Sequence, residues 1–311
     1  MKNILFFLLF SSIIMSQSNK EICVTIDDLP FQQNGTTSTE MQSYYTQKLL
    51  KKLSAEKISA IGFVNENKLE TDGKINPAKL ELLKLWLESG MELGNHTYSH
   101  KGLHNSTVSE FEADILKGET QIKPMIKKAG GQLRYFRHPY LHTGRSLEIK
   151  DSVNNFLREN GYKIAPVTID NSEWIYAFSY QKALLAGDSL LMKKIAKDYI
   201  PYMIDKVRFY EKQSEKLFGR NIKHILLIHS NALNADYIDL LLSQIEKEGY
   251  NFISLEEALK DKVYLLPDVF TGRAGISWMD RWALAQGKKK DFFAGEPRIS
   301  SWISEYSGYD E

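Results

Sequence analysis

The stretch Ile22-Cys23-Val24-Thr25-Ile26-Asp27-Asp28 is an apolar run of β-type residues that ends abruptly in two adjacent carboxylates. Neighbouring residues of a strand point to opposite faces, so Asp27 and Asp28 meet different surroundings. One of them can hold a cation while the other stays free to act as a base. The competing interpretation is a simple turn, because Asp-Asp-Leu-Pro at 27–30 is favourable loop chemistry. The rest of the chain decides between the two.

Length and composition indicate a globular chain with a full hydrophobic core. It has 311 residues, of which 43% are hydrophobic, and this size allows one large α/β domain as well as two small ones. The formal net charge of +1 argues against nucleic acid as a partner, because phosphate binding needs a basic face. The single cysteine, Cys23, lies within the strand pattern and is expected to be a buried thiol. A disulfide or a thiolate metal site is therefore excluded, and histidine and carboxylate must supply any metal ligands.

The first 18 residues read as a secretory signal peptide. Lys2 gives a positive start, an apolar run extends from Ile4 to Met15, and small polar residues follow. The run is short for a membrane span. We expect cleavage near residues 16–18 and export to the periplasm or the outside of the cell, with no stable membrane insertion afterwards; an uncleaved anchor is the alternative.

Strand and helix patterns alternate along the remainder of the chain. Continuous apolar runs are typical of strands buried on both faces, and their alternation with helices indicates parallel βαβ units in one α/β domain at 19–260. A charged helical stretch at 175–219 is expected to be an insertion, and the aperiodic tail at 261–311 an ordered extension packed on the domain. The expected strands are 22–26, 58–64, 91–94, 133–136, 164–169, 224–228 and 251–253, and the expected helices are 41–52, 78–88, 108–128, 146–160 and 236–247.

Polar residues gather just after the carboxyl ends of these strands. In barrels and open parallel sheets such ends share one face, where active sites assemble. Carboxylates, imidazoles and a guanidinium from separate strand ends are therefore expected to meet in one site rather than to serve packing. These residues are Asp27, Asp28, His96, Arg137, Asp170, Glu173 and His229.

His96 and His100 have a spacing that suits a metal if the chain turns between them. In an extended strand their Cα atoms would lie about 13 Å apart, whereas in a helical turn they would be neighbours at about 6 Å. Gly94 and Asn95 precede the pair and allow such a turn. Two histidines and a carboxylate with open coordination positions suit a catalytic Zn²⁺ or a similar ion.

The ordered set of motifs resembles the polysaccharide deacetylase family, which is carbohydrate esterase family four with its nodulation-type deacetylase homology domain. The resemblance covers roughly residues 22–253. It implies a distorted (β/α) barrel of about seven units and a metal-dependent hydrolase that removes N- or O-acetyl groups from sugars, cutting carbon–nitrogen bonds other than peptide bonds or acetyl esters. The motifs are Thr25–Asp28, His96–His100, Arg137–Tyr140, Asp170–Trp174 and Leu227–His229.

The resemblance also implies a role for each residue of these motifs. Asp28, His96 and His100 would bind the metal, with Zn²⁺ favoured and Co²⁺, Ni²⁺ or Mn²⁺ as alternatives. Asp27 would be the general base held by Arg137, and His229 the general acid oriented by Glu173. Substrate contacts would come from the Trp174 wall, the Leu227 acetyl pocket, Pro139 and the Tyr140 N–H, which would bind the oxyanion.

The chain departs from the family pattern in two places. Glu173 stands where the family more often has aspartate. Its extra methylene changes the reach of the carboxylate toward His229, and Asp170 is a second candidate for this contact. His138 lies between Arg137 and Pro139 and is expected to be a partly exposed spectator rather than a residue of the cleft. Three further histidines are expected to be loop or structural residues: His104, His142 and His224.

Two further functions stay open beside deacetylation of an acetylated polysaccharide or oligosaccharide. One is an amidase of the same fold acting on a small non-carbohydrate amide, in which 175–219 and the tail narrow a groove into a pocket. The other is a carbohydrate-binding homologue without catalysis. The tail's Trp278, Trp282 and Trp302 are expected in the core rather than on a sugar, and the sequence leaves the oligomeric state open.

Overall fold

A computed structural model describes residues 20–32 and 37–311. The expected signal peptide at 1–18 lies outside these residues. Among the helices of the described part, none is both long and apolar enough to cross a membrane.

The sheet is parallel throughout and is centred on β1, Lys20–Leu29, which pairs with β2, β8 and β9. Its order is β7-β6-β5-β2-β1-β8, with β9 beside β1. The chain that continues β7 reaches β8 through the parallel bridge between Ile169 and Leu226, so the sheet closes on itself. This confirms the predicted distorted (β/α) barrel. The other strands are β2 Ile61–Val64, β5 Glu92–Asn95, β6 Tyr135–Phe136, β7 Lys163–Ile164, β8 His224–His229 and β9 Tyr250–Phe252.

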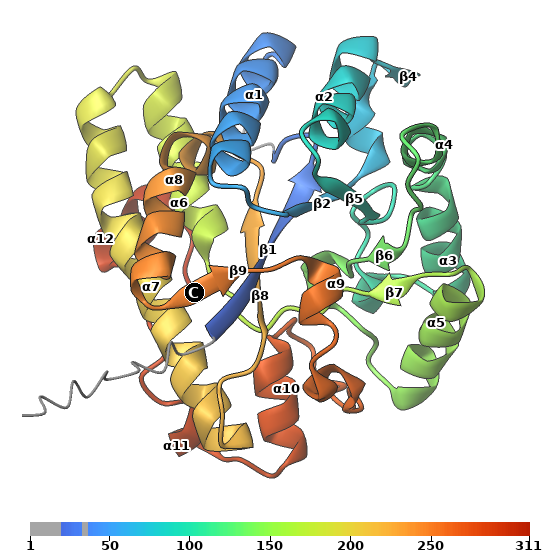
Figure 1. Ribbon diagram of the computed structural model, residues 1–311, viewed down its shortest axis with the longest axis vertical. Helices are drawn as coiled ribbons and strands as arrows, with labels where there is room; N and C mark the ends of the chain where they lie inside the picture. The colour runs from blue at the N-terminus through green and yellow to red at the C-terminus, as the bar shows by residue number, and fades with distance from the viewer. Residues whose placement is uncertain (1–19, 33–36) are drawn as a thin grey trace, which may run out of the picture.

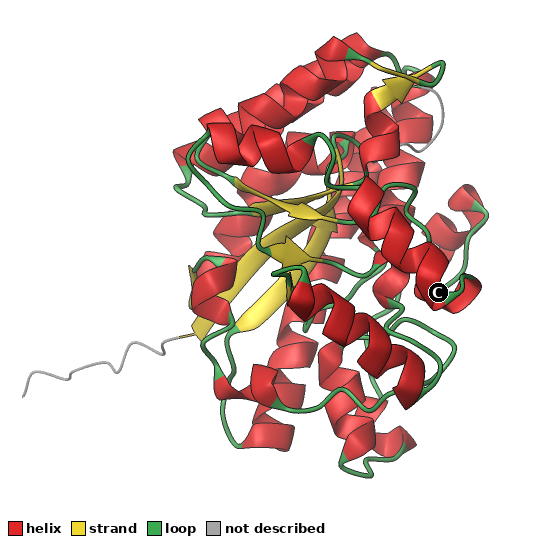
Figure 2. Ribbon diagram, turned by 90° about the vertical axis from the view of Figure 1, so that its right-hand side faces the viewer, coloured by secondary structure: helices red, strands yellow, loops and turns green. Residues whose placement is uncertain are grey.

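Helices surround the strands on the outside of the barrel (Figures 1 and 2). They begin where the sequence supplies caps: Asn76 accepts a hydrogen bond from the Ala78 N–H with Pro77 at the first position, and Thr107 and Glu110 form a capping box. The helices are α1 Thr39–Ala55, α2 Pro77–Glu88, α3 Val108–Lys117, α4 Ile122–Lys128, α5 Leu147–Glu159, α6 Glu173–Leu185, α7 Ser189–Phe218, α8 Ala232–Lys247, α9 Leu255–Ala258, α10 Trp278–Ala285, α11 Lys290–Phe293 and α12 Ser301–Ser307. Short elements complete the chain: η1 Glu66–Leu69, η2 Leu103–Asn105, η3 Pro139–Leu141, η4 Lys262–Leu265 and the hairpin of β3 Glu70–Thr71 with β4 Lys74–Ile75.

Alternation along β1 decides which side chains reach the inside of the barrel. The even-numbered residues of 22–26 belong to the large core shared with α1 and α8. Cys23, a fully buried thiol as predicted, belongs to a smaller cluster with side chains of β2, β6, β8 and α9 that fills the barrel interior. Thr25 and Asp27 continue on the Cys23 face and meet Arg137 there. The strand period therefore sends Asp27 to the centre of the barrel.

The predicted single helix at 108–128 is wrong, because the chain breaks between α3 and α4. A Cβ at Gly118 would lie 2.6 Å from the backbone of Thr97, so glycine is needed where this turn backs onto the loop after β5. The Tyr98 N–H also donates to the Asp114 carbonyl at 3.0 Å. The break thus packs α3 directly beneath the loop that carries His96 and His100.

The C-terminal residues 261–311, here called the extension, are ordered around α10, α11 and α12. Trp278 and Trp282 are buried, and Trp302 packs against the core, as predicted. Arg220 and Asp261 pair in a two-pronged ion pair at 2.8 and 2.5 Å, which fixes one end of the extension to the start of β8. The other end reaches the site described next.

Candidate active site and metal centre

The predicted strand-end residues line one cavity of about 590 Å³ at the carboxyl ends of the strands. The structure brings together every predicted site residue except Arg137 and Glu173, which lie buried behind the lining, and Pro139, which opens η3 without lining the cavity. The lining residues are Asp27, Asp28, Gln32, His96, His100, His138, Tyr140, Leu141, His142, Asp170, Asn171, Ser172, Trp174, Leu227, His229 and Gly275.

Asp27 is buried against the guanidinium of Arg137. Arg137 Nη1 lies 3.3 and 3.4 Å from the two carboxylate oxygens, Nη2 donates to Thr25 Oγ1 at 2.9 Å and Nε donates to the Ala165 carbonyl at 2.7 Å. Burial raises the pKa of Asp27 to about 6, although the guanidinium opposes this. The result is a rigidly held carboxylate whose affinity for a proton is higher than usual.

Asp28 faces the opposite way and meets imidazoles and an ammonium. Its backbone is left-handed, with φ 70°, at a shift of register between Ile26 and Leu29 near the end of β1, so Asp28 lies within the strand rather than in a simple turn. His100 Nε2 lies 3.4 Å and Lys68 Nζ 3.0 Å from Asp28 Oδ1. Burial raises the pKa of Asp28, but Lys68 and the nearby histidines outweigh it and leave the pKa below its ordinary range.

The expected helical turn between His96 and His100 is wrong, yet the two rings do meet. The loop turns through left-handed residues at Thr97 and His100, with φ 63° and 57°, and Asn95 Oδ1 accepts the Thr97 N–H at 2.7 Å. The ring centroids are 4.9 Å apart. A side-chain hydrogen bond and packing against Gly118 stabilise this loop. The rings of His96 and His100 therefore meet without a helix between them.

These residues fit a divalent metal. Donor atoms of Asp28, His96 and His100 all lie within 4.8 Å of one another. His96 Nδ1 lies 2.8 Å from the Arg137 carbonyl, which can only accept, so this nitrogen carries the proton and Nε2 offers its lone pair to an ion. Burial lowers the pKa of both histidines and keeps them neutral, and the buried Asp28 Oδ1 has no well-aligned hydrogen bond among the described residues.

His229 ends β8, where it pairs in register with Asp27 of β1, and Glu173 contacts its ring. Glu173 Oε2 lies 2.7 Å from His229 Nδ1, while Oε1 accepts hydrogen bonds from Asn231 at 2.5 Å and Asn234 at 2.7 Å. Burial lowers the pKa of His229, but the bond and charge of Glu173 outweigh it and raise the pKa to about 9. The longer glutamate therefore makes the contact. Among the described residues, the hydrogen bond to His229 Nδ1 comes from Glu173 and not from Asp170; burial raises the pKa of Asp170 to about 6 against the charge of Lys206.

His138 is not the exposed spectator that the sequence predicted. It is 1% exposed, its ring stacks on Phe111 at 5.9 Å, and it lines the cavity. Burial lowers its pKa to about 3. His224 is structural as predicted, bonded to Thr168 and Asn221.

Sequence reasoning gave no site role to six lining residues: Gln32, Leu141, His142, Asn171, Ser172 and Gly275. Asn171 and Ser172 lie inside the motif Asp170–Trp174, and Gln32, Leu141 and His142 lie within a few residues of a motif, so proximity was an available signal for these five. Gly275 belongs to the aperiodic extension and carries no local signal. Its place depends on a long-range contact with Tyr140.

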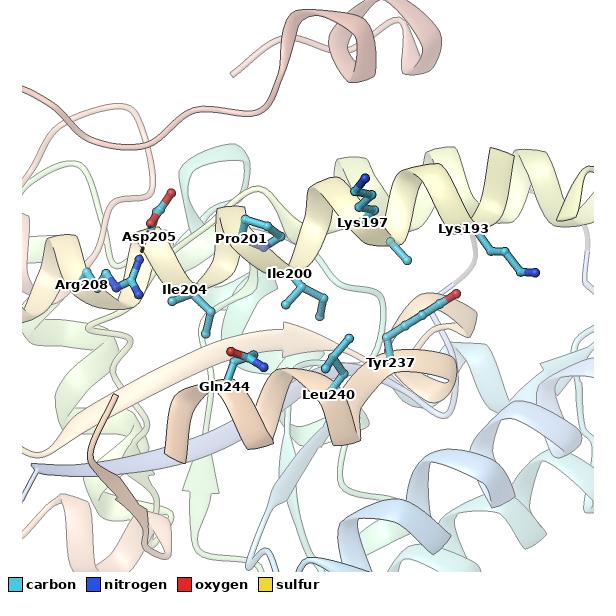
Figure 3. Close-up of a pocket in the computed structure, with 11 residues that line it drawn as sticks. Lys193, Lys197, Ile200, Pro201, Ile204, Asp205, Arg208, Tyr237, Leu240 and Gln244 are labelled. Carbon is cyan, nitrogen blue, oxygen red and sulfur yellow. Dashed lines mark hydrogen bonds and ion pairs between the residues drawn. The ribbon is translucent and has the colours of Figure 1, made fainter. Parts of the chain in front are cut away.

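A second hollow between α7 and α8 has different chemistry (Figure 3). It measures about 550 Å³ and is lined by aliphatic side chains such as Ile200, Ile204 and Leu240, with Lys193, Lys197 and Arg208 around them. None of the predicted site residues lies there. The predicted chemistry thus belongs to the cavity at the strand ends and not to this hollow.

Comparisons with known proteins agree with the sequence motifs. The family model described as polysaccharide deacetylase matches residues 15–165. The chain is 23% identical over 252 residues to the peptidoglycan-N-acetylglucosamine deacetylase PgdA of Listeria monocytogenes, covering 80% of this chain but only 41% of that protein. Two solved structures are similar in fold: a family 4 acetyl xylan esterase from Clostridium thermocellum in complex with cobalt (18% identity, 80% and 93% of the two chains, TM-score 0.49) and a family pseudoenzyme from Bacillus anthracis (16%, 78% and 66%, TM-score 0.47).

Proposed function

We propose that this chain, which belongs to the polysaccharide deacetylase family, is a metal-dependent hydrolase that removes acetyl groups from an acetylated polysaccharide or oligosaccharide. The observation that carries the proposal is the presence of two differently held acid–base groups, on the adjacent strands β1 and β8, in the same cavity as a candidate metal centre. Asp27 is held by Arg137, His229 is held by Glu173, and the cluster of Asp28, His96 and His100 lies in the same cavity.

Asp27 takes the proton of the attacking water. Asp28, His96 and His100 would hold a divalent ion, which would supply Lewis acidity to the reaction. Asp27 is suited to the task because its raised pKa gives it a useful affinity for a proton while it remains ionised near neutral pH. Arg137 keeps the carboxylate of Asp27 turned toward the cavity.

His229 gives the proton to the leaving nitrogen or oxygen. Its pKa near 9 keeps it protonated at neutral pH, and Glu173 fixes the ring so that Nε2 faces the cavity. The N–H groups of Leu141 and His142 close the η3 turn onto the His138 and Pro139 carbonyls, and we assign to the Tyr140 N–H the donation to the oxygen that becomes negative, as the family resemblance implies. Trp174 and Leu227 line the cavity beside these groups and bind the sugar and the acetyl methyl group.

Acetate release tests the proposal. The purified protein is incubated with chitin oligomers, peptidoglycan and acetylated xylan, first with a chelator and then with Zn²⁺ or Co²⁺ restored. We expect acetate from at least one polymer, lost with the chelator and regained with metal. No release from any polymer, or an Asp27→Asn variant as active as the parent, overturns it. Sugar binding without turnover under every metal would instead establish a carbohydrate-binding protein.

An amidase for small amides is the second candidate, because residues outside the barrel motifs border the cavity. Gly275 comes from the extension, and Ser172 Oγ donates to Glu311 Oε1 at 2.7 Å, so the cavity is walled from the side of the extension. Turnover that rises with glycan chain length favours the polysaccharide, and turnover confined to small amides favours this alternative.

We further propose that the protein is exported. The positive start and the apolar run at 4–15 support this. Determination of the mature N-terminus after expression with a secretion system tests it, with cleavage near residues 16–18 expected and an intact residue 1 as the contrary result.

A further inference from the structure

The loop that carries Tyr140 has a backbone that the loop alone does not favour. Tyr140 and Leu141 are consecutive non-glycine residues in the left-handed region, with φ 55° and 52°. Such a conformation is strained for a residue with a Cβ and persists only where the surroundings over-determine it. The question is what holds residues 138–144, here called the Tyr140 loop, in this shape.

Arg281 of α10 makes the strongest contacts to this loop. Its guanidinium donates to the Leu141 carbonyl and to Thr143 Oγ1, both at 2.5 Å, and pairs with Asp268 Oδ2 at 2.6 Å. Only 1% of Arg281 is exposed, and Trp278 covers one face of the guanidinium at 4.2 Å. A buried cation whose donors reach a neighbouring loop specifies the geometry of that loop.

Gly275 makes the closest approach to the same loop. A Cβ at this position would lie 1.7 Å from the Tyr140 carbonyl oxygen. The backbone of the extension at Gly275 therefore lies directly against the carbonyl group of Tyr140. Gly275 also lines the cavity together with Tyr140 and Leu141. No other residue type fits there without moving the loop.

His104 adds a third link between the extension and the loop. Its Nδ1 lies 3.0 Å from the Arg273 carbonyl, which can only accept, so Nδ1 carries the proton. Its Nε2 then accepts the Gly144 N–H at 3.2 Å. Both nitrogens are engaged, and the ring stacks on His142 of the cavity wall at 3.9 Å.

We propose that residues 268–281 of the extension complete the active site, and that Arg281 and Gly275 are positioning residues that hold the Tyr140 N–H where the acyl oxygen becomes negative. The inference rests on the proposed function, since it needs an acyl oxygen in this cavity. It assigns a catalytic purpose to a segment that lies outside the residues matched by the family model. The proposed class of substrate is unchanged. The inference adds an explanation of how the N–H group that binds the oxyanion is held in place.

Substitution of Arg281 and Gly275 tests this. Removing one oxyanion donor costs about 10²–10³ in kcat, so we expect Arg281→Met and Gly275→Ala to lower kcat for acetate release at least tenfold. KM from the same kinetics, and the affinity for Zn²⁺ measured by calorimetry, should each stay within about threefold of the parent value. Binding of the sugar and the metal uses other residues. Arg281→Lys retains the charge but not the fork, and should fall between the parent and Arg281→Met.

Arg220→Met is the matched control. It removes a two-pronged ion pair between the barrel and the extension that is remote from the cavity lining. The control should keep the parent kcat even where its melting temperature falls as far as that of Arg281→Met. An equal loss of kcat in Arg220→Met would show general loosening of the extension and overturn the inference.

Two failures can be told apart. If the parent releases no acetate or Asp27→Asn stays active, the proposed function fails. If the parent is active, Asp27→Asn is inactive, and Arg281→Met and Gly275→Ala keep the parent kcat, the inference alone fails. Should Arg281→Met not fold, Arg281→Lys and Gly275→Ala decide the matter in the same way.

Discussion

The cavity has two walls of different construction. The wall of strand ends carries the titratable side chains, and the pKa values of its neighbouring Asp27 and Asp28 shift in opposite directions. The opposite wall, made by the Tyr140 loop and the extension, presents backbone groups and neutral rings, and its one buried cation, Arg281, turns toward the loop itself. The difference teaches that the groups proposed for proton transfer are held by strands of one sheet, whereas the groups proposed for positioning are held by contacts between distant segments.

The largest expected effect divides Asp27 from Asp28. Asp27→Asn should lower kcat by about 10²–10⁴, as loss of a general base does, while the metal stays bound because Asp28, His96 and His100 are untouched. Asp28→Asn should lose the metal and the activity together, since it removes a charged ligand. Metal content of both variants after dialysis, measured beside kcat, checks this.

Equal metal loss in the two variants would contradict the division. It would mean that Asp27 also binds the ion, which the 3.7 Å between Asp27 Oδ2 and His96 Nε2 makes a concrete alternative. Arg137→Lys provides a further comparison, because it retains the charge beside Asp27 but loses the bonds to Thr25 and Ala165.

The next effect concerns the pH dependence set by Glu173. In the proposed mechanism His229 acts as the acid, so activity should persist up to its pKa of about 9 and fall above it. Glu173→Gln removes the hydrogen-bonded charge that raises this pKa, and the opposing effect of burial then prevails. The alkaline limb of the kcat profile should therefore move to lower pH, and kcat at pH 8 should drop about tenfold.

Asp170→Asn is the control for this measurement. Asp170 lines the same cavity but makes no hydrogen bond to His229 among the described contacts, so its loss should leave the alkaline limb nearly in place. An alkaline limb that moves more in Asp170→Asn than in Glu173→Gln would show that Asp170 tunes the acid.

The sequence predicted the strand-end wall because two short-range rules determine it. Continuous apolar runs mark buried parallel strands, and residues just past their ends meet at one edge; Asp27, Asp28, His96 and His229 follow from these rules alone. The loop that joins His96 to His100 did not follow, because its left-handed turn depends on Asn95 and on Gly118 from another element. Periodicity cannot register such contacts.

The loop-and-extension wall was beyond sequence reasoning for the same physical reason. Gly275 and Arg281 act through contacts with residues more than 130 positions earlier in the chain, and their segment shows no helical or strand period. The burial of His138 likewise depends on Phe111, which comes from α3. A residue's burial in a loop is decided by its neighbours in space rather than by its neighbours in sequence.

A smaller effect tests the side of the cavity used for binding. Trp174 lines the cavity and contacts Tyr309 of the extension with ring centroids 5.1 Å apart. Trp174→Ala should raise KM for a glycan oligomer about three- to tenfold, the worth of one aromatic contact, and leave kcat nearly unchanged. Trp302→Ala, which removes a tryptophan that is not part of the lining, should leave KM unchanged; a loss of kcat without a change in KM in Trp174→Ala would contradict a binding role.

The smallest effect concerns Lys68, which brings a cation to the strand-end wall itself. Its Nζ lies 3.0 Å from Asp28 Oδ1 and also donates to the Asp28 carbonyl at 3.3 Å. In the metal-free protein the Lys68 ammonium compensates the buried carboxylate of Asp28, but the same ammonium would repel a divalent ion bound to Asp28.

Lys68→Met should therefore have two effects of opposite sign. The free energy of unfolding of the metal-free protein should fall by about 1 kcal/mol, as for a modest ion pair, while Zn²⁺ should bind a few-fold more tightly. Thermal unfolding with a chelator and calorimetric titration with Zn²⁺ measure the two, and Lys68→Arg, which retains the charge, should change neither strongly. Weaker metal binding in Lys68→Met would contradict this prediction. It would mean that Lys68 orients the Asp28 carboxylate for the ion instead of competing with the ion.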